Sequence, residues 1–117
     1  MAKKIMIVED DQITAKYLKE LFEDNGYEVI IAYDGTEAEE AVKEFKPDLI
    51  TLDLEMPKEW GPRFYRKMRK DKELKDTPVI VISGLPDSKH AIKDAVAVLN
   101  KPFDKGKLLN IVKRTTG

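Results

Sequence analysis

The chain has 117 residues, of which 42% are hydrophobic and 37% are charged, and its formal net charge is -1. This length fits one compact domain with its own core and leaves no room for a second. The balanced charge provides no basic field for nucleic acid or an anionic membrane, so proteins and small ions are the expected partners. The absence of cysteine excludes disulfides and thiol chemistry. No apolar run is long enough for a signal peptide or a membrane span, and we expect a cytoplasmic protein.

Short apolar runs alternate with segments of helical periodicity along the whole chain. The runs predict strands at 5–8, 27–32, 49–52, 78–83 and 95–99. The periodic segments predict helices at 12–25, 36–45, 61–70, 88–94 and 104–112. This order predicts an α/β protein with a five-stranded parallel sheet, right-handed crossovers and helices on both faces.

Several helix boundaries and faces can be predicted from local signals. Asp11 and Asp104 are expected to cap the first and last helices, and Gly26 to end the first. Thr36, with Glu39 three residues later, resembles a capping box. The larger apolar residues of the first helix recur at helical spacing, which predicts that they form its buried face: Ile13, Tyr17, Leu18, Leu21 and Phe22.

Polar side chains follow four of the five predicted strands. Glu9 and Asp10 follow the first strand, Asp53 the third, Ser83 the fourth and Lys101 the fifth. Parallel strands end at the same edge of a sheet, so these side chains are expected to meet in one crevice. Three carboxylates repel each other unless a cation neutralises them, and hard oxygen ligands suit Mg²⁺. A metal beside a carboxylate, a lysine and a hydroxyl is typical of phosphoryl transfer.

With these motifs in this order, the chain resembles the receiver domain of two-component response regulators. The resemblance covers nearly the whole chain, and it implies a flavodoxin-like, doubly wound (βα)5 fold with residues 1–117 as one receiver domain. Each motif is weak evidence alone, but all of them occur at the expected strand ends. They are Glu9-Asp10, then Asp53 followed by Met56-Pro57 and Gly61, then Ser83-Gly84, and finally Lys101-Pro102-Phe103.

The resemblance implies a role for each acid of the predicted crevice. Asp53 would accept a phosphoryl group from the phosphohistidine of a histidine kinase or from a small phosphodonor. Asp10 and Asp53 would bind Mg²⁺ directly, and Glu9 directly or through water. Glu55, two residues after the acceptor, would contribute its backbone carbonyl to the metal.

The remaining motifs have implied roles around the phosphoryl group. Lys101 would pair with the phosphoryl oxygens, and Ser83 would move to them and report their presence. Gly84 would leave the phosphoryl group open to water. The family also places a cis peptide bond before the proline, here Lys101-Pro102.

The implied function is a phosphorylation-dependent switch of protein interactions, whose only chemistry is Mg²⁺-dependent self-phosphotransfer and autodephosphorylation. A sensor histidine kinase or phosphotransfer protein is the expected partner upstream, and an unidentified protein the partner downstream. We expect no direct binding to nucleic acid or membrane, and a monomer or a weak phosphorylation-dependent dimer. The chain is compatible with a single-domain regulator, like those of chemotaxis, and with an excised domain.

Two departures from the family pattern concern the output of the signal. The interval between Ser83 and Lys101 is short, which predicts a shortened fourth helix over 88–94. Val98 stands three residues before the lysine, where the family has an aromatic switch residue. Family output often runs through the fourth helix, fifth strand and last helix. We therefore hypothesise that this chain signals through another face or couples weakly.

Three further features have ordinary structural interpretations. Trp60 is expected to pack over the loop before the third helix, with a partner contact as the alternative. His90 is expected to be a surface residue, because the chain has no other histidine and no cysteine that could bind a metal together with it. A basic run is expected to be a solvated face: Arg63, Arg66, Lys67, Arg69, Lys70 and Lys72.

Other function classes fit the sequence less well. A pseudo-receiver that binds partners without phosphorylation is suggested by Val98 and the short fourth helix, but the complete set of site motifs argues against it. A phosphatase of the haloacid dehalogenase type would resemble D-x-D, whereas Asp53-Leu54-Glu55 stands here without room for a cap domain. A flavin binder would need a phosphate-cradling loop after the first strand, where acids stand instead.

Overall fold

The computed structural model describes residues 2–84 and 95–117. The strands are β1 (Lys4–Val8), β2 (Glu28–Ala32), β3 (Leu49–Leu52), β4 (Val79–Ser83) and β5 (Ala97–Asn100). The helices are α1 (Gln12–Asp24), α2 (Gly35–Phe45), the 3₁₀ turn η1 (Pro57–Glu59), α3 (Trp60–Lys70) and α4 (Lys105–Thr116). The predicted short helix at 88–94 and His90 lie outside the described residues.

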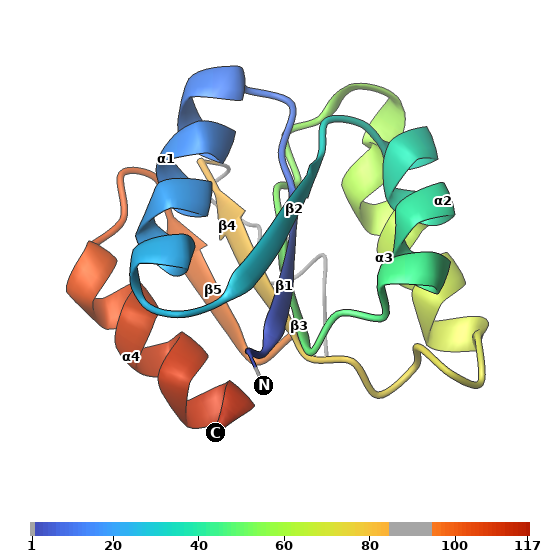
Figure 1. The fold of residues 1–117 in the computed structure, drawn as a ribbon. Coiled ribbons are helices and arrows are strands. Elements are labelled where there is room, and N and C mark those ends of the chain that lie inside the picture. The colour runs from blue at the N-terminus through green and yellow to red at the C-terminus, as the bar shows by residue number, and fades with distance from the viewer. Residues whose placement is uncertain (1, 85–94) are drawn as a thin grey trace.

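The five strands form one parallel sheet in the order β2-β1-β3-β4-β5. Helices α1 and α4 cover one face of this sheet, and α2 and α3 cover the other (Figure 1). The order is that of the flavodoxin-like doubly wound fold, in which the reversal between β1 and β3 opens a crevice at the carboxyl ends of the strands. The predicted fold class is confirmed.

The central strands are buried on both faces, as their continuous apolar runs predict. In β1, Ile5 and Ile7 pack with α1 and α4, whereas Met6 and Val8 pack with α2 and α3. Successive side chains of a strand point to opposite faces, so a strand covered on both sides needs residues that tolerate burial at successive positions. The helices contribute matching apolar stripes, which fix both layers on the sheet.

Asp side chains cap three of the four described α-helices, namely α1, α2 and α4. Asp11 accepts from Thr14 N at 3.2 Å, and Asp104 accepts from Lys107 N at 3.1 Å, as expected. At α2 the predicted capping box is wrong: Asp34 accepts from Glu37 N at 2.8 Å. Because Asp34 satisfies the free backbone donor first, α2 begins at Gly35, and Thr36 lies inside the helix.

The prediction for the buried face of α1 is wrong at two residues. Ile13 is 81% exposed and Tyr17 is 45% exposed. The stripe that packs on the sheet consists of Ala15, Leu18 and Phe22 instead. Small Ala15 lets the helix approach the sheet closely, which leaves Ile13 and Tyr17 on the neighbouring ridge. None of the described helices combines the length and apolarity needed to span a bilayer.

Candidate functional site

Backbone hydrogen bonds beyond the strand ends hold the site residues at the carboxyl edge. Glu9 N donates to Ala32 O, and Asp53 N donates to Val8 O, both at 3.0 Å. Lys101 N donates to Ser83 O, also at 3.0 Å. The sheet therefore fixes the positions from which the Glu9, Asp53 and Lys101 side chains converge.

Three carboxylates meet at the ends of β1 and β3. One oxygen each of Glu9, Asp10 and Asp53 lies within 4.8 Å of the others. Glu9 and Asp53 are each only 2% exposed, whereas Asp10 is open to solvent. These three oxygens are hard ligands on one side of a pocket, with the open side at Asp10, so the set fits a divalent cation that keeps some of its water, such as Mg²⁺.

Lys101 is the cation of this pocket. Its Nζ lies 2.9 Å from Glu9 Oε1, 3.6 Å from Asp53 Oδ1 and 3.9 Å from Glu55 Oε2. The family resemblance implies that Lys101 pairs with a phosphoryl group; its ion pair with Glu9 is not predicted by the sequence. Among the described residues, one ammonium faces four carboxylates, counting Asp10, which leaves an excess of negative charge in this part of the pocket.

The burial and the charges of the pocket shift the pKa values of Glu9 and Lys101. Burial, followed by a hydrogen bond with Asp53, raises the pKa of Glu9 from 4.5 to about 7. Burial alone would lower the pKa of Lys101, but its hydrogen bond to Glu9 and the nearby carboxylates raise it. Near neutral pH, Glu9 therefore exchanges a proton readily, while Lys101 stays charged.

The Glu55 side chain also belongs to the pocket, although only its backbone carbonyl was predicted to take part. Glu55 N donates to Asp53 Oδ1 at 2.9 Å, which holds the turn after β3 close to Asp53. The Glu55 carboxylate lies over Gly84, where a Cβ would come within 2.8 Å of Glu55 Oε1. The signal for this placement was the two-residue spacing from Asp53, since alternate residues of an extended segment share a side.

The other predicted residues lie on β4, on β5 and just beyond it. Ser83 is fully buried at the end of β4, paired in register with Asn100. The peptide bond between Lys101 and Pro102 is cis. Val98 is half-buried opposite Val81 and packs against the α2 and α3 side of the core. The structure thus brings every predicted polar residue of the site to one edge.

Trp60 is a packing residue at the start of α3. Its ring lies against Gly35 at the start of α2, where an added Cβ would come within 2.7 Å of Trp60 Cγ. The next residue, Gly61, lies so close to β3 that a Cβ would meet Asp53 O at 2.7 Å. These contacts favour the packing interpretation of Trp60 and join the first turn of α3 to the backbone of Asp53.

The apolar residues left exposed on α1 lie beside the pocket. Ile13, Thr14 and Tyr17 line a shallow hollow together with Lys101, Pro102 and Phe103. The rings of Tyr17 and Phe103 are 6.2 Å apart between centroids. Exposed apolar side chains next to a charged pocket are typical of a protein docking surface.

Comparisons with known proteins agree with this arrangement. The family model of the response regulator receiver domain matches residues 5–113. Protein Rrf1 of Nitratidesulfovibrio vulgaris is 36% identical, with 97% of this chain and 83% of Rrf1 covered. The polar-differentiation response regulator DivK of Brucella anthropi is 31% identical, with 100% of this chain and 98% of DivK covered.

A solved structure gives the same result at the level of the fold. The chemotaxis response regulator CheY4 of Vibrio cholerae superposes with a TM-score of 0.89 at 29% identity, covering 98% of this chain and 99% of CheY4. Receiver domains are signalling switches of two-component systems, not classical enzymes, and they interact with histidine kinases and downstream proteins. The chain belongs to the response regulator receiver domain family.

Proposed function

We propose that this chain is a cytoplasmic, phosphorylation-dependent switch that accepts a phosphoryl group on Asp53 in the presence of Mg²⁺. The observation that carries the proposal is the convergence of Glu9, Asp10 and Asp53 within 4.8 Å, with Lys101 Nζ 3.6 Å from Asp53. A nucleophilic carboxylate, a set of metal ligands and a cation are the groups that phosphoryl transfer requires. The proposal treats residues 1–117 as one receiver unit.

The proposed metal site uses the carboxylates of Glu9, Asp10 and Asp53 and the backbone carbonyl of Glu55. Receiver domains bind Mg²⁺ at an acidic site, and the oxygen-only ligand set of this pocket supports the same assignment here. When bound, Mg²⁺ would neutralise charge that develops on the phosphoryl oxygens. Glu9 must release its proton to act as a ligand, which its raised pKa makes dependent on pH.

The proposed reaction is a direct displacement at phosphorus. A carboxylate oxygen of Asp53 attacks the phosphorus, while the bond from phosphorus to the histidine nitrogen of the donor breaks and leaves its electron pair on that nitrogen. Lys101 would shift from Glu9 to the incoming phosphoryl oxygens, because a phosphoryl group carries more charge than one carboxylate. Ser83 would then bind the phosphoryl group and Gly84 would leave room for water at hydrolysis.

A protein phosphodonor is supported by the surface beside the pocket. Ile13, 81% exposed, and Tyr17, 45% exposed, border the hollow that Lys101 lines. A donor that buries these two side chains would bring its phosphohistidine to the mouth of the pocket. We therefore propose a histidine kinase or phosphotransfer protein upstream and another protein downstream, with a monomer or weak phosphorylation-dependent dimer as the working form.

The test is covalent modification by acetyl phosphate, followed by intact mass. The wild type is expected to gain one phosphoryl group when Mg²⁺ is present and none with a chelator. Asp53→Asn should gain none. Asp48→Asn is the matched control, because Asp48 lies just before the opposite end of β3, where its carboxylate accepts from Lys4 N. A wild-type protein that stays unmodified would favour a pseudo-receiver, which the complete acidic pocket does not favour.

A further inference from the structure

The outer face of α3 carries an uninterrupted set of exposed cations. Its members are spaced i, i+3, i+4 and i+7, so they lie on one side of the helix. No Asp or Glu occurs within Trp60–Lys70. The remaining cation of the helix, Arg69, turns away and stacks its guanidinium 4.7 Å from the centroid of the Tyr65 ring. We call the other four the basic face of α3: Arg63, Arg66, Lys67 and Lys70.

These charges are poorly compensated within the part of the chain that the structure describes. Lys67 Nζ lies 3.1 Å from Glu39 Oε1 on α2. Among the described residues, Arg63, Arg66 and Lys70 form no ion pair. Like charges at these spacings destabilise a helix, and Arg63 lies near the amino end, where the helix dipole also disfavours a cation. An anionic partner would relieve both effects.

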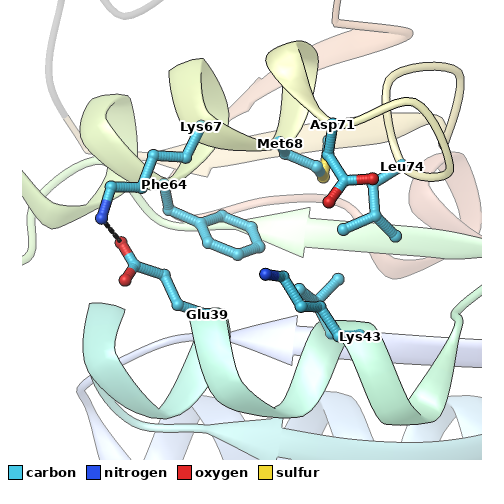
Figure 2. A pocket seen from close by; sticks show the side chains of 8 residues that line it. Glu39, Lys43, Phe64, Lys67, Met68, Asp71 and Leu74 are labelled. Atoms are coloured by element: carbon cyan, nitrogen blue, oxygen red, sulfur yellow. Dashed lines mark ion pairs between the residues drawn. The ribbon is translucent and has the colours of Figure 1, made fainter.

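A groove with an apolar floor runs beside this face, between α2 and α3 (Figure 2). Its volume is about 170 Å³, which exceeds the size of cavity that takes up benzene, about 150 Å³. The pair of Lys67 and Glu39 bridges one end of the groove, and Lys43 points into it from α2 (Figure 2). The floor consists of side chains that the core holds in place: Val42, Phe64, Met68 and Leu74.

We propose that the basic face of α3 and the α2–α3 groove form a docking surface for an acidic protein segment that inserts one large apolar side chain. The groove would take the apolar side chain, and the basic face would pair with flanking carboxylates. The surface is separate from the acidic pocket, and binding to it requires no phosphoryl group on Asp53.

The geometry favours a protein segment over nucleic acid. The floor side chains, Phe64 included, are only 2–6% exposed, so they form the bottom of a narrow hollow and offer no open ring for a base to stack on. Glu39 and Asp71 stand on the rim of the groove and repel phosphates and carboxylates alike, so only an uncharged side chain of the partner fits there. An apolar anchor flanked by carboxylates satisfies both the apolar floor and the basic face.

The test uses a short synthetic peptide of Glu, Asp and Ala with one central leucine, titrated to millimolar concentration. Methyl NMR shifts are expected at Met68, Val42 and Leu74. Replacing the leucine of the peptide by alanine should weaken binding about 10-fold or more, because one buried apolar side chain is lost. Arg63→Glu with Arg66→Glu should weaken binding of the leucine peptide about 10-fold or more, and added salt should weaken binding to the wild type.

The matched control is Lys105→Glu with Lys107→Glu, which changes the charge equally in the first turn of α4, on the other side of the sheet (Figure 1). This variant should bind the peptide like the wild type. Equal weakening by both double variants, no shift in the groove, or equal binding of the alanine peptide would overturn the proposal. A short DNA duplex that shifts α3 resonances more strongly than the leucine peptide would also overturn it.

Discussion

The acidic pocket and the basic face of α3 are both strongly charged, but they differ in burial and in the number of ion pairs that their residues form. In the pocket, Glu9 and Asp53 are each 2% exposed and share Lys101. On α3, Arg63 and Arg66 are exposed and form no ion pair among the described residues. Like charges that are buried close together raise the free energy of the folded state and shift each other's pKa values. Exposed like charges are screened by water and salt. Mutation, pH and salt should therefore have different effects on stability and binding at the two regions.

The largest effect is expected from removing Lys101, the cation that pairs with the pocket carboxylates among the described residues. Lys101→Met should slow phosphorylation by acetyl phosphate about 10- to 100-fold, since a hydrogen bond to a charged group contributes about 1.5–3 kcal/mol. The same variant should bind Mg²⁺ more tightly, because the ammonium no longer competes for Glu9 and Asp53. Lys105→Met, on exposed α4, is the control. An unchanged phosphorylation rate in Lys101→Met would show that the ammonium does not contact the phosphoryl group.

The next effect is a pH dependence near neutrality that arises in the pocket, at Glu9. The pKa of Glu9 is raised from 4.5 to about 7, so the folded state binds this proton more tightly than the unfolded state. The contribution to the free energy of unfolding is full below about pH 4.5 and is lost as pH rises through about 7. Thermal unfolding of metal-free protein should show this loss, and Glu9→Gln should lack it.

The affinity for Mg²⁺ should change with pH in the opposite direction to the stability of the metal-free protein. Mg²⁺ affinity is expected to rise as pH passes through about 7, because Glu9 must be ionised to bind the metal. Calorimetric titrations at several pH values measure this slope directly. A wild-type affinity that is flat with pH, like the affinity expected for Glu9→Gln, would contradict a ligand role for Glu9.

The smallest effect is expected on α3. Arg63→Gln removes repulsion from Arg66 and Lys67 and should raise the free energy of unfolding by about 0.2–0.5 kcal/mol per relieved pair at low salt. The gain should disappear at high salt. Lys67→Gln loses its ion pair with Glu39 and should give no such gain. Denaturant unfolding at two salt concentrations compares the variants, and a salt-independent gain would mean that packing, not charge, is responsible.

The elements that sequence predicts well are those fixed by local chemistry. The runs at 5–8 and 49–52 predict strands buried on both faces, because no charged residue interrupts them. Asp11 and Asp104 predict helix starts because a short acidic side chain reaches the free backbone donors. The edge of the sheet then follows from the topology, and with it the meeting of the strand-end residues.

The errors and omissions arise where competing neighbours decide the outcome. Asp34 displaces Thr36 as the cap of α2, and Ala15 rather than Ile13 faces the sheet. Helical spacing identifies ridges, but the fit against the sheet selects which ridge is buried. The pairing of Lys101 with Glu9 joins residues 92 positions apart. Such a contact depends on tertiary geometry. The order of the motifs predicts that both residues lie at the same edge of the sheet, but it does not predict the ion pair between them.

The central claim is that Asp53 is the acceptor, and the most direct measurement locates the modification on the chain. Protein treated with acetyl phosphate and Mg²⁺ would be reduced with borohydride, which converts an acyl phosphate to an alcohol, and then digested for peptide mass mapping. We predict homoserine in place of aspartate at position 53, with Glu9, Asp10 and Glu55 unchanged. Reduction at one of those other acids, or at none, would contradict the assignment of Asp53.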